Sequence, residues 1–215
     1  MTAGSWQRAG AVVALTVILW LLAGCSGGSQ PAPPSPAPAS PSASPTASTT
    51  PTTTAAAVPY KPADVNGPAQ NVPKPVMPAE AKEFTEKGLE AFVRYWYTVY
   101  NYVVETADPT PGDPLMAPEC SDCYQLLYSF KDAAAKGQWT IGNSARVDGI
   151  KPYFQVGSGN DHQALVQFAL LPGQVVGPEH QVLKDYPLVP VKANVYILRF
   201  ESGHWLISAI GKPVN

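Results

Sequence analysis

The feature that most limits what this chain can fold into is a long stretch without charge. No Asp, Glu, Lys or Arg occurs between Arg8 and Lys61, and residues 26–58 consist of Ser, Gly, Gln, Pro, Ala and Thr with a single Val. Such a segment lacks the large apolar side chains that offset the entropy of ordering. Nine prolines from Pro31 to Pro59 stiffen it towards polyproline II. The composition therefore predicts a spacer, and its Ser, Thr and Pro content leaves O-glycosylation open.

The segment before this spacer has the pattern of an export signal. Arg8 is its only charged residue, and its apolar run over residues 11–22 is shorter than a membrane span. The run ends in Leu-Ala-Gly-Cys at residues 22–25, which resembles the lipobox of bacterial lipoproteins. This resemblance implies that residues 1–24 are a signal peptide cut off before Cys25, whose sulfur then carries a diacylglyceryl group. An ordinary signal peptide, or a short membrane helix with an incidental cysteine, is the alternative.

A lipid on Cys25 implies a protein held on the extracytoplasmic face of the cell membrane. Residues 25–72 are then predicted to be a tether, and residues 73–215 a folded domain long enough for a hydrophobic core. The net charge is −2 and no basic run occurs, which excludes nucleic acid as a partner because phosphate binding needs clustered Lys and Arg. The expected partners are the membrane, through the lipid, and a cell-envelope protein or a small apolar ligand on the domain.

Two amphipathic helices are predicted at the start of the domain. The first runs from Pro78 to about Glu105 and ends before the Pro- and Gly-rich turn at residues 107–112. Its apolar positions share one stripe, formed by Leu89, Phe92, Trp96, Val99 and Val103. The second runs from Ser121 to Lys136 and ends at Gly137. Its apolar face carries Cys123, Leu127, Phe130 and Ala134.

After the second helix the apolar pattern changes to alternation, which predicts strands. An early strand is expected over residues 145–156. Later strands alternate at Ala164, Val166, Phe168 and Leu170, at Val191, Ala193, Val195 and Ile197, and at Trp205, Ile207 and Ala209. Residues 172–190 are interpreted as a surface loop, with a long hairpin connection or a movable lid as the alternatives. Two helices followed by about four antiparallel strands predict an α+β fold.

The end of the chain resembles a known fold family. Residues 196–207, Tyr-Ile-Leu-Arg-Phe-Glu-Ser-Gly-His-Trp-Leu-Ile, look like the closing hairpin of nuclear-transport-factor-2-like (NTF2-like) domains. Roughly residues 73–215 also resemble actinobacterial lipoproteins of unknown function, through Pro75-Val76-Met77-Pro78, Tyr95-Trp96, Asn101-Tyr102, Cys120-Ser121-Asp122-Cys123 and Gly137-Gln138-Trp139. These resemblances imply two N-terminal helices packed on a curved four-stranded antiparallel sheet, which together form an open cone. They imply no catalytic residues.

Cys120 and Cys123 are the two cysteines left after the lipid site. In an extracytoplasmic compartment a disulfide between them persists, and their position at a predicted helix start is compatible with one. A redox-active pair would use the same helix start, but that motif normally follows a strand in a βαβ unit. A metal site would need two further ligands, which no second CxxC or close His pair supplies. A structural disulfide is the favoured interpretation.

The first helix is crowded with aromatic residues, and two readings of them stay open. Tyr and Asn side chains that point into a cone would make an apolar pocket with a few polar groups, as ligand sites usually have. In that case Tyr95, Tyr100, Asn101 and Trp139 are the predicted pocket lining. Alternatively, and preferably, the aromatic side chains pack the helix against the sheet and the second helix.

No catalytic constellation is recognisable in the sequence. His162, His180 and His204 lie far apart, and His162 and His204 are expected at the surface in turns. The acidic residues Asp148, Asp161, Glu179 and Asp185 are candidate acids or bases, but the sequence assigns them no partner. Phosphate-binding and dinucleotide motifs are missing. No catalytic residue, cofactor or metal is therefore predicted.

The sequence thus favours a non-enzymatic binding or protein-interaction module, anchored by Cys25 and held away from the membrane by the tether. The rival hypothesis is an extracytoplasmic small-ligand carrier or enzyme that uses the interior of the cone. The interior decides between them, because a roomy pocket with converging polar side chains favours the rival. Thiol-disulfide exchange by the CxxC pair is a third hypothesis.

Overall fold

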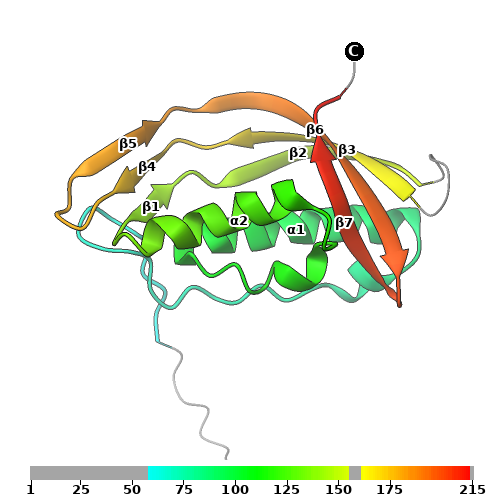
Figure 1. Ribbon diagram of the computed structural model, residues 1–215, viewed down its shortest axis with the longest axis horizontal. Coiled ribbons are helices and arrows are strands. Elements are labelled where there is room, and N and C mark those ends of the chain that lie inside the picture. Colours follow the sequence, from blue (N-terminus) through cyan, green and yellow to red (C-terminus); the bar gives the residue numbers. More distant parts are fainter. Residues whose placement is uncertain (1–57, 155–160, 214–215) are drawn as a thin grey trace, which may run out of the picture. The chain divides into compact units, whose positions relative to one another are not determined.

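The computed structural model describes residues 58–154 and 161–213 (Figure 1). The predicted signal peptide, Cys25 and the predicted tether up to residue 57 lie outside these residues. The described elements are, in order, η1 (Ala79–Lys82), α1 (Glu86–Thr106), η2 (Asp113–Leu115), α2 (Ser121–Ala134), β1 (Trp139–Gly142), β2 (Ala145–Tyr153), β3 (Asp161–Leu170), β4 (Gly173–Val176), β5 (Val182–Tyr186), β6 (Val189–Glu201) and β7 (His204–Gly211). Within these two stretches, no helix has both the length and the apolar character needed to cross a membrane.

Helix α1 carries the predicted apolar stripe but begins later than the sequence suggests. Leu89, Phe92, Trp96, Val99 and Val103 are all fully buried, which confirms the stripe. The predicted start at Pro78 is wrong, because residues 79–82 form only the short 3₁₀ turn η1. Thr85 is the N-cap of α1, with an extended backbone and a side chain that accepts a hydrogen bond from Gly88 N at 2.9 Å. The helix ends at Thr106, and the C-cap residue Ala107 has a left-handed backbone.

Helix α2 follows the loop that contains η2. It runs almost as predicted and ends two residues before Lys136. Cys123 and Leu127 of its apolar face are fully buried, Phe130 is partly buried, and Ala134 is exposed.

The strands form two antiparallel sheets rather than one. The four-stranded sheet has the order β2-β3-β6-β7 and contains the strands that the sequence predicts. A three-stranded sheet with the order β1-β4-β5 was not predicted. Residues 172–190, interpreted as a surface loop, contain β4 and β5, so that interpretation is wrong. The α+β class is confirmed.

The two sheets continue one another end to end. Two residues separate β1 from β2, β3 from β4, and β5 from β6, and the neighbour order is the same in both sheets. Asn143 N donates to Pro172 O at 3.0 Å, and Leu171 N donates to Ser144 O at 2.9 Å, so the ladder is bridged across the break. Figure 1 shows β1 followed by β2, β3 followed by β4, and β5 followed by β6, each running along the helices. The two sheets therefore follow one another along the helices, with a shared break and bend at residues 143–144, 171–172 and 187–188 (Figure 1).

The core lies between α1 and one face of the four-stranded sheet. The buried residues of this face are Ala164, Val166, Phe168, Tyr196, Leu198, Trp205 and Ile207. The apolar residues Val195 and Ile197, which the sequence also predicts as an alternating set, lie on the opposite face, in register with Leu165 and Gln163. Ala209 joins them there, because a bulge between Ile197 and Leu198 shifts the register of β7.

Residues 58–72, predicted as the end of the tether, pack against the domain. Lys61 and Gln70 pair as an isolated bridge. The carbonyl of Asp64 accepts a hydrogen bond from Trp139 Nε1 at 2.8 Å, and Tyr60 Oη donates to Glu105 at 2.9 Å. The folded part of the chain therefore includes this segment and extends at least to residue 58, rather than starting near Pro73.

Candidate functional site

The four residues predicted to line a pocket lie in different places. Tyr100 lines a cavity between α1 and the four-stranded sheet. Trp139 lines a hollow at the ends of α1 and α2. Tyr95 Oη donates to a backbone carbonyl of the loop before η1, at 3.4 Å, and the side chain of Asn101 pairs with the backbone of β2. The set is not brought together into one site.

The cavity around Tyr100 corresponds to the interior of the predicted cone, where the rival hypothesis places a ligand pocket. This cavity is small. Its volume is about 160 Å³, close to the volume that holds one benzene-sized molecule. Trp96, Tyr97, Tyr100, Leu126, Ala145, Phe168, Leu170, Asn194, Tyr196 and Ile210 line it. The sequence did not predict Tyr97, Tyr196 or Asn194 as lining residues, because Tyr196 and Asn194 fall between the alternating apolar positions 193, 195 and 197.

The tyrosines of this cavity are hydrogen-bonding groups without acid-base chemistry near neutral pH. Tyr196 Oη donates to Tyr97 Oη at 2.9 Å. Burial raises the pKa of Tyr100 and of Tyr196 to about 12. Burial, and secondarily the neighbouring Tyr196, raises the pKa of Tyr97 well above its usual range. All three phenols stay protonated, so none of them is a general base at neutral pH.

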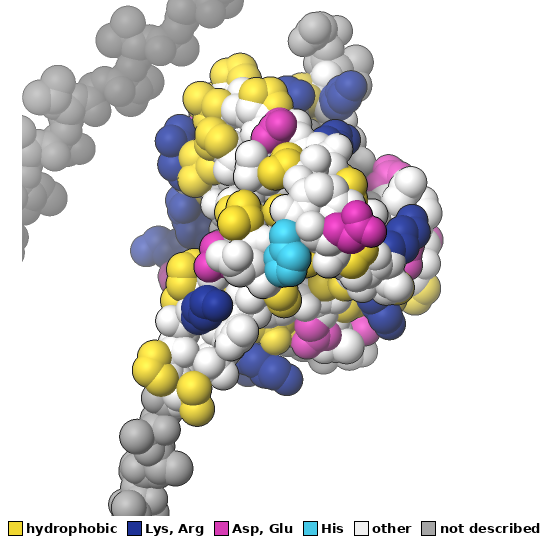
Figure 2. Space-filling view, turned by 90° about the vertical axis from the view of Figure 1, so that its left-hand side faces the viewer, with side chains coloured by type: hydrophobic (Ala, Val, Ile, Leu, Met, Phe, Trp, Pro, Cys, Tyr) yellow, Lys and Arg dark blue, Asp and Glu magenta, His cyan; other side chains and the backbone are white. Residues whose placement is uncertain are grey.

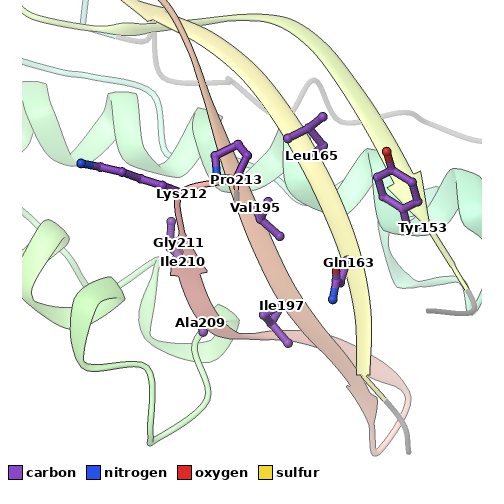
Figure 3. Close-up of a pocket in the computed structure, with 10 residues that line it drawn as sticks. All are labelled: Tyr153, Gln163, Leu165, Val195, Ile197, Ala209, Ile210, Gly211, Lys212 and Pro213. Atoms are coloured by element: carbon purple, nitrogen blue, oxygen red, sulfur yellow. The ribbon is translucent and has the colours of Figure 1, made fainter. Parts of the chain in front are cut away.

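A broader hollow lies on the outer face of the four-stranded sheet, the face turned away from the helices (Figure 3). Its volume is about 550 Å³ and it is open to solvent. We call it the outer hollow; Tyr153, Gln163, Leu165, Val195, Ile197, Ala209, Ile210, Gly211, Lys212 and Pro213 line it.

The outer hollow is built from two rows of residues across the strands. One row pairs Leu165 with Val195, and the next pairs Gln163 with Ile197. The neighbouring positions on β7 are small, Gly211 and Ala209, and a Cβ added to Gly211 would meet no atom within 4 Å. Small side chains beside branched ones make the depression in this face of the sheet.

A third hollow, of about 420 Å³, lies where the helices end next to β1. Trp139 forms one wall, with its ring centroid 5.7 Å from that of His180, and Phe130 of α2 forms another. Pro68, which belongs to the segment predicted as tether, also lines it. Glu105 is the charged residue of this lining, and Tyr60 already donates a hydrogen bond to it.

Exposed apolar side chains also gather on β5, on the two-residue connection that follows it and on the start of β6. They are Val182, Leu183, Leu188 and Val191. Figure 2 looks onto this end of the domain, where hydrophobic side chains lie on the surface with Lys and Arg side chains among them. Lys184 of β5 lies 4.5 Å from the ring centroid of Tyr186. Proline residues at 187 and 190 interrupt this edge, as they commonly do where strand edges are kept from pairing.

His162 is buried, so the expectation of a surface histidine is wrong. It is the second residue of β3 and lies inside an aromatic cluster, with its ring centroid 4.7 Å from that of Phe154, 5.2 Å from that of Trp205 and 5.4 Å from that of Phe84. Its Nδ1 contacts the carbonyl oxygen of Phe154. Burial lowers the pKa of His162, and the negative charge of Asp161 opposes that change. Phe84 is half exposed and covers the cluster.

Cys120 and Cys123 are joined by a disulfide at the start of α2. Their Cα atoms are 5.3 Å apart, and Cys120 is the N-cap residue of the helix. Both residues are buried in the core cluster. Exchange with another thiol needs access to a sulfur atom, so this burial favours a structural bond over a redox-active one.

The candidate acidic residues do not converge on a reaction centre. Asp148 forms an ion pair with Arg146 at 2.8 Å, and Asp185 accepts a hydrogen bond from Gln174 at 2.8 Å. Asp161 lies beside the aromatic cluster. In the part of the chain that the structure describes, no three His, Cys, Asp or Glu side chains are grouped in a way that suits a metal ion.

Residues 58–210 match a family described as a family of unknown function, DUF6318. The chain belongs to this family. The match starts at Val58, so the family region includes the segment that packs on Trp139 and Glu105. A search of curated proteins finds no match.

Several solved structures resemble part of the DUF6318 chain. Aln2 from a Streptomyces species is 11% identical with a TM-score of 0.38, over 60% of this chain and 94% of that one. An uncharacterized protein with a cystatin-like fold from Caulobacter vibrioides is 12% identical with a TM-score of 0.36, over 59% and 87%. The intermembrane space region of the chloroplast protein ARC6 is 12% identical with a TM-score of 0.39, over 60% and 98%. Similarity at this level carries no argument about function.

Proposed function

We propose that this DUF6318 protein is a lipoprotein that presents a partner-binding domain on the outer face of the cell membrane. The proposed anchor is a diacylglyceryl group on Cys25, supported by the Leu-Ala-Gly-Cys sequence after a short apolar run. The uncharged, Pro-rich segment that follows supports the role of a spacer, because it cannot build a core of its own. We also propose that the domain is the NTF2-like cone of actinobacterial lipoproteins, with α1 packed against the inner face of a bent sheet.

The binding role is supported by the position of the apolar surface that the domain leaves exposed to solvent. The interior cavity is only about 160 Å³, and the fully buried Trp96 forms part of its lining. The outer hollow is larger, about 550 Å³, and its floor is apolar. Apolar surface that faces water is a common mark of an interaction site. The domain therefore offers its outer sheet face, rather than its interior, to a partner.

The anchor is tested by metabolic labelling with a clickable palmitate analogue. The wild-type protein should carry the label and sediment with the membrane, whereas Cys25→Ser should do neither. The double variant Cys120→Ser/Cys123→Ser is the matched control, because it also loses cysteine side chains but keeps the proposed lipid site. A label that persists in Cys25→Ser would contradict the anchor.

The binding role is tested on membranes solubilised in mild detergent. Native electrophoresis should show the wild-type protein in a complex larger than its own mass, and Ile197→Glu should abolish that complex. Val76→Glu is the control, because Val76 is 85% exposed and lies outside the outer hollow. If Ile197→Glu leaves the complex intact, or if the protein migrates alone, the outer hollow is not the interaction site.

The second candidate function is a small-ligand carrier or enzyme that uses the interior. It is favoured by one observation, the convergence of Tyr97, Tyr100, Tyr196 and Asn194 on the interior cavity. The cavity volume restricts the ligand to a small aromatic or alicyclic molecule. Phenol and indole are suitable probes, and Ala145→Leu, which enlarges a lining side chain, should remove their binding in native mass spectrometry. Absence of binding by the wild-type protein would dismiss this candidate.

A further inference from the structure

We propose that the outer hollow binds an amphipathic α-helix of a partner protein, whose apolar face is flanked on both sides by carboxylates. This inference rests on the proposed partner-binding function and names the chemistry of the partner. It follows from the floor of the hollow, from the charges at its margins and from the distance between those margins.

The floor matches an apolar helix face. Leu165, Val195 and Ile197 project from adjacent strands on the same side of the sheet, beside the small Ala209 (Figure 3). Side chains at helix positions i, i+3, i+4 and i+7 form a stripe that can lie on such a surface, with one of them over the depression at Gly211.

The margins of the hollow are basic. Lys151 shares the cross-strand row of Leu165, Val195 and Gly211, at the β2 side, and its Nζ lies 5.2 Å from the ring centroid of Tyr153. Lys212 follows that row at the β7 side and lines the hollow. None of the residues that line the hollow is acidic, although the whole chain has a net charge of −2. A partner with carboxylates on both flanks is complementary to this arrangement.

The spacing of the margins fits the width of a helix. The row from Lys151 to Gly211 crosses four strands, and strand spacing puts its ends about 14 Å apart. A helix with its side chains is about 10–12 Å wide, so it fits between the two lysines when it lies along the strands.

The openness of the hollow argues against a small molecule. A pocket for a small ligand buries about 70–90% of the ligand surface, which an open sheet face cannot do. The hollow is also accessible in an anchored protein. The chain enters the domain beside Glu105 at the end of α1, whereas Tyr153 of the hollow adjoins Phe154, which packs on Phe84 before the start of α1. The helix thus separates the point of entry from this part of the sheet (Figure 1).

Photo-crosslinking in the cells that produce the protein tests this proposal. A benzoylphenylalanine replaces Gln163, a polar residue at the hollow, in the full-length chain. The expected product is a crosslink to another protein, with the linked peptide located by mass spectrometry in a segment of helical periodicity and flanking Asp or Glu. Lys151→Glu/Lys212→Glu should lower the crosslink yield roughly tenfold by placing carboxylate against carboxylate. Lys184→Glu/Lys192→Glu, with the same charge change outside the hollow, should leave the yield unchanged.

The experiment distinguishes failure of the helix-binding proposal from failure of the proposed partner-binding function. A protein crosslink that is insensitive to Lys151→Glu/Lys212→Glu, or a linked segment without carboxylates, overturns the acidic helix but keeps the outer hollow as an interaction site. A crosslink to lipid, to a second copy of this chain, or to nothing overturns both. Loss of membrane attachment in the labelling experiment concerns only the anchor.

Discussion

The side chain of Asn101 exchanges two hydrogen bonds with the backbone of Ala145. Asn101 Nδ2 donates to Ala145 O at 3.0 Å, and Ala145 N donates to Asn101 Oδ1 at 2.7 Å. The amide thus acts as a neighbouring strand would, at the free edge where β2 begins. This fixes the start of the four-stranded sheet against α1, and it gives Asn101 a structural role in place of the predicted pocket role.

Removal of this amide should destabilise the domain. Asn101→Ala leaves a partly buried N–H and C=O of β2 without partners, which should lower the free energy of unfolding by about 1–3 kcal/mol. Urea unfolding followed by Trp fluorescence measures the change. Thr98→Ala, on the exposed side of the same helix, is the control and should change stability by less than about 0.5 kcal/mol. Equal effects of the two variants would show that the pairing of Asn101 with Ala145 does not contribute to stability.

The tyrosine pair in the interior should show strong energetic coupling. Tyr196→Phe removes the donor to Tyr97, and Tyr97→Phe removes the acceptor, so each single variant leaves one buried hydroxyl without its partner. Each should cost about 1–2 kcal/mol, while the double variant should cost clearly less than the sum. A double-mutant cycle of urea unfolding checks this. Additive effects would mean that the two hydroxyls do not stabilise one another.

The buried His162 should make the domain sensitive to mild acid. Burial lowers its pKa in the folded state, so the unfolded chain binds the proton more readily. The contribution of His162 to stability is therefore complete above about pH 6.5 and is lost as the pH falls below that value. The difference in melting temperature between pH 7.5 and pH 5.5, about a unit on either side of that value, should shrink in His162→Gln. The exposed His204→Gln should behave as wild type, and a wild-type-like shift in His162→Gln would contradict the assignment.

The disulfide should contribute stability rather than redox activity. It closes a very short loop, for which the chain-entropy estimate is about 2 kcal/mol, and Cys120→Ser/Cys123→Ser should be destabilised by roughly that amount. The wild-type domain should not accelerate insulin reduction by dithiothreitol, because both cysteines are buried. Reductase or isomerase activity that disappears in the double variant would instead support the exchange hypothesis.

The segment before Pro73 should be part of the stable domain. A chain that starts at Val58 keeps the hydrogen bonds of Trp139 and Glu105 to Asp64 and Tyr60, whereas a chain that starts at Pro73 loses them. The shorter chain should be less stable by about 1–3 kcal/mol. Equal melting temperatures for the two chains would show that residues 58–72 do not stabilise the domain and belong to the tether.

The sequence predicts the elements that have a strong period and misses those that depend on distant contacts. The stripe from Leu89 to Val103 is readable because every member faces the same core. Strands β4 and β5 cannot be recognised in the same way, because Pro172 and Pro187 flank them and β5 is exposed on both faces. The burial of His162 is unpredictable because Phe84, which covers it, lies 78 positions earlier in the chain.

In the candidate site, too, local features can be predicted from the sequence and features that depend on distant contacts cannot. The Cys120–Cys123 bond is local, and its position at a helix start is compatible with the spacing of the two cysteines. The role of Asn101 depends on Ala145, which is 44 residues away, and no local pattern reports that pairing. The outer hollow arises from the register of four strands with small residues on β7. The bulge that turns Ala209 outwards carries no clear sequence mark.

The bend shared by the two sheets has a consequence for how relatives of this chain can differ in length. Because β1, β4 and β5 continue β2, β3 and β6 beyond a common break, residues added in pairs to neighbouring strands on the far side keep every side chain on its original face. The end that carries β5 can therefore grow or shrink without disturbing the sheet that holds the core. Length variation among homologues should concentrate in β1, β4 and β5 and the turns beside them, in steps of two residues per strand.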